Sequence, residues 1–383
     1  YKGKGGEPAK GKGGESYKGK GGEPAKGKGK GADLPTLADI VATTDDLSVL
    51  FAALKASGLL EFFEDYTYEY TVLAPLNSAF DTLAAEYPEL FAVLFDKYWI
   101  LHLVDILTMH VTEPAVLSTD LTNDQEIEMF NLETVSVEIG EGVCFSPSVT
   151  GSSCVVLADV MAKNGVAHVV DDVIAPFWFE FTVADIVAGL PETSTLLSLV
   201  QCANLTDALA TTMGLTVFAP TNDALAGADA EFLCSEEGLP TLIDVLTYHV
   251  LPMPLPSILL EEGKTDYKTL QGSDATITYY PDEKYPEKTV LTINDANIID
   301  IDYGARNGIV HVIDTILFPP APPSKGKGVA PSKGKGVAPS KGKGKGSSSY
   351  KGKGSSSMSY KGKGSSSSKG SPSMSYKGKG KGY

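Results

Sequence analysis

The apolar positions divide each half of the chain into a helical part followed by a part rich in strands. Between Thr36 and Ser57 apolar residues recur at helical spacing, and Gly58 then supplies a residue type that commonly ends helices. Residues 90–110 again follow a helical period, whereas residues 134–139 alternate between apolar and polar with a period of two. Because helices come first and strands later, the pattern predicts an α+β fold.

Two short segments predict how neighbouring elements are joined. The apolar strand expected over 71–75 is followed by Asn77 and Ser78, either of which can cap a helix. Later, Asn164 and Gly165 separate two apolar runs, and an Asn-Gly pair readily adopts the positive φ angles of a tight hairpin turn. The sequence therefore predicts that the strand-rich part closes with a hairpin.

A long internal repeat indicates that the central region is duplicated. Four sequence blocks return in the same order, at offsets of 146, 145, 139 and 143 residues. The blocks are LADIVA at Leu37 and VADIVA at Val183, TVLAPLNSAF at Thr71 and TVFAPTNDAL at Thr216, VDILTMHV at Val104 and IDVLTYHV at Ile243, and NGVAHVVD at Asn164 and NGIVHVID at Asn307. We therefore expect two homologous domains, over residues 34–177 and 178–319.

The two ends of the chain differ from this central region in composition and charge. Residues 1–33 and 320–383 consist mainly of Lys, Gly, Ser, Pro and Tyr repeats without an apolar face, which predicts disordered tails. Residues 1–30 hold 9 Lys and 3 Glu, and residues 321–383 hold 15 Lys and no acid, so 8 of the 32 basic and 45 of the 48 acidic residues lie between them. An acidic body of net charge −37 thus carries tails of +6 and +15.

The four cysteines allow three disulfide pairings. Cys144 and Cys154 fall in the first expected domain and Cys202 and Cys234 in the second, which favours one bridge in each domain. Residues 143–156 are interpreted as a loop that such a bridge closes, because Ser-Pro-Ser and Gly-Ser-Ser lie between its cysteines. The even count fits an oxidising, extracellular compartment, and the alternative is four buried free thiols in a cytosolic protein.

The sequence contains no recognisable catalytic or metal-binding motif. It lacks a Gly-x-Ser-x-Gly elbow and a phosphate-binding loop, because every Gly-Lys of the tails is followed by Gly. The equivalent pairs His110/His249 and His168/His311 lie beside apolar residues, which favours core imidazoles that donate to backbone carbonyls over metal ligands. Residues 300–304 match a calcium loop only in part, since a third oxygen ligand and the final Glu are missing. We expect no enzyme activity, no cofactor and no metal.

Two further features concern modification and location. Asn204 begins the only N-glycosylation sequon of the chain, Asn-Leu-Thr, which would be occupied in a secreted protein if the site is exposed. No apolar run of about 18 residues occurs, so no membrane span is expected. Because the chain begins at Tyr1 inside a repeat, we expect a processed form, in which a missing signal peptide carries no information.

The lysine-rich tails predict binding to polyanions. Each exposed ion pair is weak and screened by salt, but many linked contacts add up through effective concentration. Anionic polysaccharide, matrix protein or a silica surface are the expected partners, and nucleic acid is disfavoured because Arg306 is the only arginine of the chain. The lysines expected to bind are Lys325, Lys327, Lys333, Lys335, Lys351, Lys353, Lys361 and Lys363.

The repeated blocks resemble the motifs of fasciclin (FAS1) domains. TVLAPLNSAF and TVFAPTNDAL resemble the first signature motif, and the two NG blocks resemble the closing hairpin. The resemblance covers both halves of the central region and implies a wedge-shaped β-sandwich with packed helices, which works outside the cell in adhesion and catalyses no reaction. The Tyr-His motif of the family maps onto Tyr248 and His249, whereas the first domain has Met109 before His110. Any contact with a cell-surface receptor through this motif is therefore expected in the second domain.

These features together predict a secreted, non-enzymatic adhesion, matrix or cell-wall protein. In this interpretation the two domains form a rigid adhesive body and the tails attach it to an anionic matrix. The alternative is a biomineral scaffold in which the tails are the primary functional element, since the Lys, Ser, Gly and Tyr pattern of residues 324–383 is similar to that of silica-forming diatom proteins.

Overall fold

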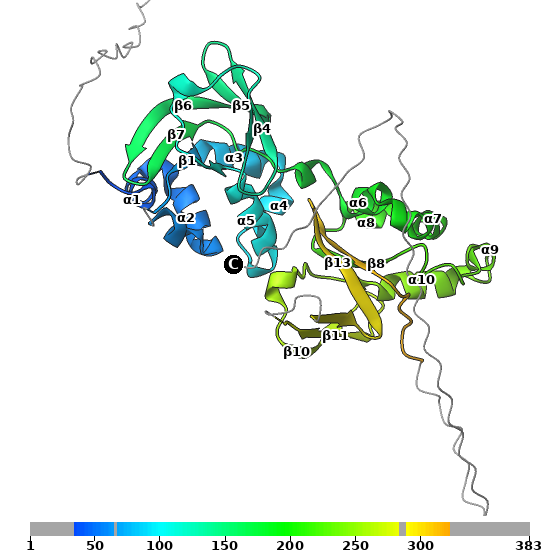
Figure 1. The fold of residues 1–383 in the computed structure, drawn as a ribbon. Coiled ribbons are helices and arrows are strands. Elements are labelled where there is room, and N and C mark those ends of the chain that lie inside the picture. The colour runs from blue at the N-terminus through cyan, green and yellow to red at the C-terminus, as the bar shows by residue number, and fades with distance from the viewer. Residues whose placement is uncertain (1–33, 65–66, 283–288, 322–383) are drawn as a thin grey trace, which may run out of the picture.

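The computed structural model describes residues 34–64, 67–282 and 289–321. They form two similar domains joined by a 3-10 helix, Phe177–Glu180 (Figure 1). In each domain helices precede most of the strands, as the apolar pattern predicts. The eight tail lysines named above lie outside the described residues.

The first domain contains five α-helices and seven strands among the described residues. The helices are α1 (Leu37–Thr43), α2 (Ser48–Ser57), α3 (Asn77–Glu86), α4 (Pro88–Val93) and α5 (Ile100–Thr108). The strands are β1 (Tyr70–Pro75), β2 (Val111–Thr112), β3 (Glu126–Glu128), β4 (Thr134–Ile139), β5 (Val143–Ser148), β6 (Gly151–Ala162) and β7 (Gly165–Val170).

The second domain repeats this arrangement. Its helices are α6 (Val183–Gly189), α7 (Ser194–Cys202), α8 (Thr206–Thr211), α9 (Ala230–Leu233) and α10 (Leu239–Tyr248). Its strands are β8 (Leu215–Pro220), β9 (Val250–Leu251), β10 (Gly263–Lys268), β11 (Asp274–Tyr280), β12 (Val290–Ile293), β13 (Ala296–Ala305) and β14 (Gly308–Ile313).

Each domain has a seven-stranded mixed sheet of the same topology. The strand order is β2-β1-β7-β6-β5-β4-β3 in the first domain and β10-β11-β12-β13-β14-β8-β9 in the second. The pairs β1–β7 and β8–β14 are parallel, and the remaining pairs among the described strands are antiparallel. Register shifts along β6 and β13 mark β-bulges, which bend a strand and increase its twist. Each sheet is therefore bent and twisted at these strands.

Strand β1 shows why the block TVLAP is apolar without interruption. All six of its residues are buried, because the two faces of the strand face different parts of the core. Val72 and Ala74 belong to the cluster that packs against the helices, whereas Leu73 packs with Val135 and Phe145 inside the folded sheet. The same strand therefore joins both halves of the hydrophobic core.

The helices begin where the sequence repeats Thr-x-x-Asp. Thr36 accepts a hydrogen bond from the Asp39 N–H, and the Asp39 carboxylate accepts one from the Thr36 N–H, which forms a capping box. Thr182 and Asp185 form the equivalent box at the start of α6. Both domains therefore start their first helix with the same local hydrogen bonds.

The predicted closing hairpin is present, and its glycine has a second role. Gly165 has a φ angle of +143°, and a Cβ atom there would lie 2.0 Å from the Tyr70 carbonyl oxygen. The Asn164 side chain accepts from the Leu37 N–H at 2.8 Å and donates to the Phe63 carbonyl at 2.9 Å. The Asn-Gly pair thus connects the hairpin to the first helices as well as turning the chain.

Three expectations about local structure were wrong in detail. The helical stretch over 36–57 is broken at Thr44, which is extended, and the stretch over 90–110 is broken near Asp96, which begins a 3-10 turn. Asn77 does not cap α3, because its side-chain oxygen accepts instead from the Val49 N–H at 2.9 Å and so joins α3 to α2. Apolar periodicity continues through such breaks, since consecutive short helices pack against the same core.

Residues 143–156 are mostly strand rather than loop, which corrects another expectation. Strands β5 and β6 pair across this segment, with Cys144 directly opposite Cys154. The Ser and Gly residues between the two cysteines occupy the strand ends and the turn, where the short polar side chains remain compatible with pairing. The bridge therefore links adjacent strands.

Candidate functional site

The Tyr-His motif of the second domain lies inside the fold. Tyr248 is 2% exposed, and its hydroxyl donates to the Asp274 carbonyl at 2.9 Å and accepts from Asn294 Nδ2 at 2.9 Å. The ring thus joins the end of α10 to β11 and to the turn before β13. A receptor contact through this side chain itself would require its hydroxyl to give up both partners.

His249 has an equally internal position. Its Nε2 accepts from the Leu317 N–H at 3.0 Å, so Nδ1 carries the proton and donates to the Val245 carbonyl at 2.8 Å. In the first domain His110 makes the same two bonds, from the Ile174 N–H at 2.9 Å and to the Ile106 carbonyl at 2.7 Å. Burial disfavours the charged imidazolium and lowers the pKa of each ring to about 4. Both histidines are therefore neutral near pH 7 and hold the chain that follows the closing hairpin.

The second histidine pair also has partners in the backbone. His168 Nδ1 accepts from the Asp159 N–H at 3.2 Å and Nε2 donates to the Val116 carbonyl at 2.9 Å. His311 Nδ1 accepts from the Asp302 N–H at 3.1 Å and its Nε2 donates to a backbone carbonyl at 2.9 Å. The expectation that these four histidines are core imidazoles bonded to backbone carbonyls is confirmed.

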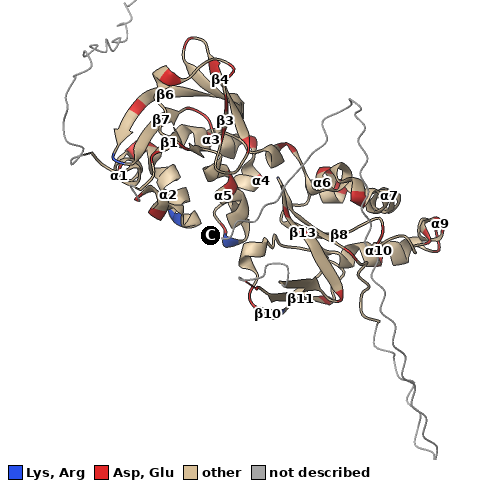
Figure 2. Cartoon of the chain, in the orientation of Figure 1, with Lys and Arg blue, Asp and Glu red and all other residues tan. Residues whose placement is uncertain are grey.

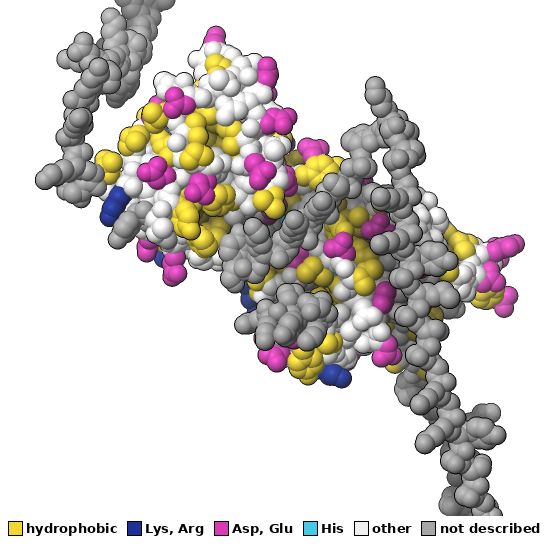
Figure 3. Space-filling model, viewed as in Figure 1, with side chains coloured by type: hydrophobic (Ala, Val, Ile, Leu, Met, Phe, Trp, Pro, Cys, Tyr) yellow, Lys and Arg dark blue, Asp and Glu magenta, His cyan; other side chains and the backbone are white. Residues whose placement is uncertain are grey.

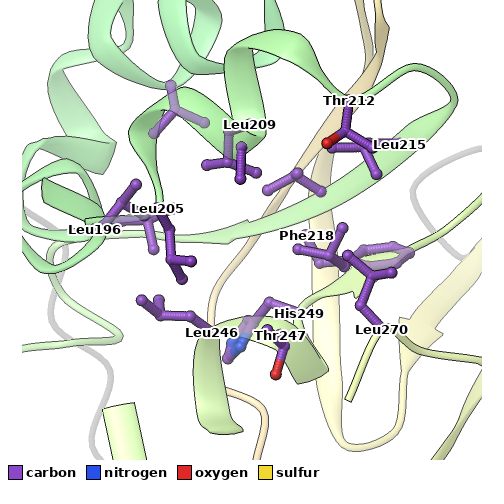
Figure 4. Close-up of a pocket in the computed structure, with 15 residues that line it drawn as sticks. Leu196, Leu205, Leu209, Thr212, Leu215, Phe218, Leu246, Thr247, His249 and Leu270 are labelled. Carbon is purple, nitrogen blue, oxygen red and sulfur yellow. The ribbon is translucent and has the colours of Figure 1, made fainter. Parts of the chain in front are cut away.

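A cavity of about 80 Å³ lies beside the His249 ring, between α6, α7, α8, α10 and strand β8 (Figure 4). Leucine and valine side chains supply most of its wall, together with Phe218. No sequence motif marks this cavity, because each residue of its wall also fits an ordinary core position. The signal in the sequence that points to this cavity is the difference in residue type between the two repeats at the positions of its wall.

The junction between the domains is a second internal site. Trp178, in the connecting 3-10 helix, donates its indole N–H to the Asp105 carboxylate of α5 at 2.6 Å. His102, which also lies on α5, bonds through Nε2 to the Ala305 carbonyl of the second domain at 3.0 Å. The Arg306 guanidinium lies 5.7 Å from the centre of the Tyr87 ring. The two domains therefore meet through specific contacts of α5, the connecting helix and the end of β13.

Burial at this junction changes the acidity of its carboxyl groups. Burial raises the pKa of Asp105 from 3.8 to about 6, although the Trp178 hydrogen bond opposes the rise. Glu133, which accepts from the Phe177 N–H at 2.8 Å, has its pKa raised to about 7 by burial and then by the Asp105 charge. His102 is also buried, which lowers its pKa to about 4, and its Nδ1 has no hydrogen-bond partner among the described residues. No sequence motif marks Asp105, Glu133 or His102 as functional.

The junction has no set of groups suited to metal binding. No cluster of three or more His, Cys, Asp or Glu side chains that could hold a metal ion occurs among the described residues. In the segment that partly matches a calcium loop, Asp300 accepts from the Tyr303 hydroxyl at 2.5 Å, and Asp302 accepts from Ser257. The carboxylates of this segment are thus used within the fold.

The structure contains the favoured disulfide pairing and exposes the asparagine of the sequon. The structure joins Cys144 to Cys154 and Cys202 to Cys234, the pairing that the sequence favours. Asn204 is exposed in the turn between α7 and α8, with a φ angle of 56°, so its amide is accessible for glycosylation. Of the helices that the structure describes, none alone is long and apolar enough to cross a membrane, and one bent pair, Val183–Gly189 with Pro191–Cys202, would be so by length and composition only.

Acidic residues, coloured red on the ribbon, are spread over both domains, whereas the blue basic residues are few (Figure 2). The space-filling view likewise shows acidic side chains spread between apolar ones on the visible face (Figure 3). The basic side chains of the described residues are scattered: Lys55, Lys97, Lys163, Lys264, Lys268 and Arg306. Lys268 is already paired with Asp274 at 2.7 Å, and Lys97 lies 4.7 Å from the centre of the Tyr98 ring. The described surface therefore has no basic cluster for a polyanion.

Comparisons with known proteins agree with this architecture. The model of the family described as "Fasciclin domain" matches residues 45–176 and 191–319. "Protein sll1483" of Synechocystis sp. is 36% identical over 142 residues, which are 36% of this chain and 74% of that protein. Human periostin is 28% identical over 296 residues, which are 76% of this chain but only 30% of periostin.

A solved structure of a FAS1 domain pair from the insect cell adhesion molecule fasciclin I is also similar. It is 18% identical, covers 71% of this chain and 97% of that chain, and has a TM-score of 0.36. The family match extends over both domains and includes His110 and His249 as well as the closing hairpin of each domain. The chain therefore belongs to the fasciclin domain family, with one domain in each half, and is not an enzyme.

Proposed function

We propose that this protein is an extracellular adhesion or matrix protein whose lysine-rich tails bind an anionic matrix and whose two fasciclin domains form the body that they hold. The observation that carries the proposal is the separation of charge along the chain. The tails have charges of +6 and +15, against −37 between them. Since the described surface has no basic cluster, the tails are the part of the chain suited to an anionic partner.

The body has features that suit work outside the cell. Both domains contain a disulfide bond, and disulfides persist in oxidising compartments such as the extracellular space. The junction orders the two domains through the connecting helix, so that a partner bound by one domain is held at a defined position relative to the other. Adhesion and matrix assembly, which the fasciclin resemblance implies, require such a stable body and no reaction.

The Tyr248–His249 pair supports a receptor role only indirectly. Both side chains are 2% exposed, so a receptor would contact the surface that they position. Ile243 and Asp244 lie on the exposed side of α10, one turn before the pair. In this proposal the motif fixes the end of α10 and the neighbouring exposed residues make the contact.

A binding experiment on the full chain tests the role of the tails. The eight lysines Lys325, Lys327, Lys333, Lys335, Lys351, Lys353, Lys361 and Lys363 are replaced by Gln, and binding to an acidic polysaccharide resin and to silica particles is measured over about 50–500 mM salt. The matched control replaces Lys55, Lys97 and Lys163 of the body by Gln. We expect the tail variant to lose most of its binding and the control to retain it.

Comparing the polysaccharide resin with the silica particles separates the main proposal from its alternative. Loss of binding to the polysaccharide supports attachment to an anionic matrix. Binding to silica alone, with precipitation of silica by the unmodified chain, would instead favour the biomineral scaffold. Equal binding by the tail variant and the unmodified protein, independent of salt, would refute the role of the tail lysines in either form.

A further inference from the structure

The two domains contain cavities at equivalent positions, but the cavities differ in size. The cavity of the second domain measures about 80 Å³, and that of the first about 10 Å³. Their walls correspond through the internal repeat, with His249 in the place of His110 and Val217 in the place of Val72. The fold alone therefore does not create the larger cavity.

The first domain has three aromatic residues around this position that the second domain lacks, and Phe63 among them lines the small cavity. In the other direction, Phe218 of the second domain stands where the first has Leu73. In the first domain Tyr70 packs edge-on against Phe63 and Phe130, with ring centres 6.3 and 5.6 Å apart. Leucine occupies each equivalent place in the second domain. The three leucines are Leu209 for Phe63, Leu215 for Tyr70 and Leu270 for Phe130.

Shared backbone hydrogen bonds establish these three equivalences. The Phe63 carbonyl accepts from Asn164 Nδ2, as the Leu209 carbonyl accepts from Asn307 Nδ2. The N–H of Tyr70 donates to the Asn164 carbonyl, as that of Leu215 donates to the Asn307 carbonyl. The N–H of Phe130 and that of Leu270 donate to the carbonyls of Val111 and Val250. The backbone is thus retained while the aromatic rings are replaced by smaller side chains.

The larger cavity is accessible and offers little to water. Ala208, Thr212 and Leu270 are exposed at its mouth, whereas Leu196 and Phe218 are buried in its wall (Figure 4). The polar groups beside the His249 ring are already engaged, because both nitrogens of His249 are bonded and the Thr247 hydroxyl donates to the Ile243 carbonyl at 2.7 Å. The Thr212 hydroxyl lies at the exposed mouth. Apolar cavities take apolar ligands, as an enclosed engineered cavity of about 150 Å³ takes benzene or xenon.

We propose that this cavity of the second domain is a binding site for a neutral apolar group of about the size of one aromatic ring. The ring would lie among Leu209, Leu215 and Leu270, where the first domain places its own aromatic side chains. Part of the ring can extend through the open mouth, which accommodates a ligand somewhat larger than the cavity of about 80 Å³. The site is independent of the lysine tails and adds an apolar recognition function to the adhesive body.

The test uses the full chain and benzene as the probe, followed by NMR of the methyl groups. Saturable shifts are expected for Val200, Leu205 and Leu246, which line the cavity. The double variant Leu209→Phe, Leu270→Phe restores two of the aromatic rings of the first domain and should weaken benzene binding roughly tenfold or more. The control, Ile258→Phe, adds a ring at a site that is 69% exposed and should leave binding unchanged.

Each outcome decides the proposal. Benzene shifts that the double variant removes and the control retains support it. Co-sedimentation of the protein with phosphatidylcholine vesicles, if the double variant also removes it, supports the site and identifies a lipid chain as the source of the apolar group. The absence of saturable benzene shifts, or shifts that persist in a double variant whose methyl spectrum remains folded, would overturn the assignment.

Discussion

Replacing Asp105 by Asn should stabilise the protein at neutral pH by an amount that grows with pH. Asp105 is half-buried, and its carboxyl is packed under the Trp178 indole, a neutral donor 2.6 Å away. Asparagine keeps an acceptor oxygen for this indole but cannot ionise. The substitution therefore removes the cost of a buried charge and keeps the local geometry.

The magnitude follows from the pKa of Asp105, which is raised from 3.8 to about 6 in the folded protein. A raised pKa favours the folded state below about pH 4, and this contribution is lost as the pH rises through 6. The difference is roughly two pH units at about 1.4 kcal/mol each, so the ionised group destabilises the folded protein by about 3 kcal/mol at neutral pH. We compare the free energy of unfolding of Asp105→Asn with that of the unmodified protein at each pH. This difference should be about 3 kcal/mol larger at about pH 7.5 than at about pH 4.

The assay is denaturant unfolding of the variant and the unmodified protein across this pH range. Taking the difference at each pH cancels the titration of the histidines, which the two proteins share. Asp244→Asn is the matched control, because Asp244 occupies the equivalent position on α10 but is exposed. A difference between Asp105→Asn and the unmodified protein that stays constant with pH would refute the argument from burial, whatever its sign.

Three further predictions concern the conserved geometry of the two domains. His110 and His249 have pKa values lowered from 6.5 to about 4, so their contribution to stability is present above pH 6.5 and is lost as the pH falls through 4. Thermal unfolding across this range should show a loss of roughly 3 kcal/mol in the free energy of unfolding for each histidine. The variant His249→Gln should reduce this loss at acid pH. Tyr248→Phe removes the hydroxyl that joins Asp274 to Asn294 and should cost about 1–3 kcal/mol in the free energy of unfolding; an unchanged value in denaturant titration would contradict its structural role. Gly165→Ala would place a Cβ atom 2.0 Å from the Tyr70 carbonyl oxygen and should destabilise by more than about 3 kcal/mol, while Gly140→Ala, with no atom within 4 Å, should have little effect on the melting temperature.

Much of the fold could be predicted from the sequence because each domain repeats its own local signals. The block TVLAP predicts a strand buried on both faces, and Asn164-Gly165 predicts the closing hairpin. The internal positions of the histidines were also predictable, since the repeat places them beside apolar residues. Helix breaks such as Thr44 were not, because apolar periodicity persists where consecutive short helices share one core.

The residues of the junction could not be predicted, for a physical reason. His102 bonds to the Ala305 carbonyl across 203 positions of sequence, and periodicity within a domain says nothing of how two domains meet. The cavity was hidden in another way, because leucine at position 209, 215 or 270 is an ordinary core residue when taken alone. Only the hydrogen bonds shared by the repeats show that these leucines replace aromatic rings.

The equivalent residues Asp105 and Asp244 indicate which properties come from the fasciclin fold and which from the joining of two domains. Both occupy the second position of the same repeated block, on α5 and α10 respectively. Asp244 is exposed and accepts from Gln271 Nε2 at 3.0 Å, whereas Asp105 is covered by Trp178 of the connecting helix. A carboxylate that remains hydrated costs nothing on folding, while the same group covered by the junction makes the stability of the docked pair fall with rising pH. The part of the pH dependence that Asp105 causes, a loss of stability as the pH rises from about 4 to 7, should therefore belong to the contact between the domains. Replacing Trp178 by Leu should reduce it by admitting water to Asp105, even though the variant loses packing and the hydrogen bond at every pH.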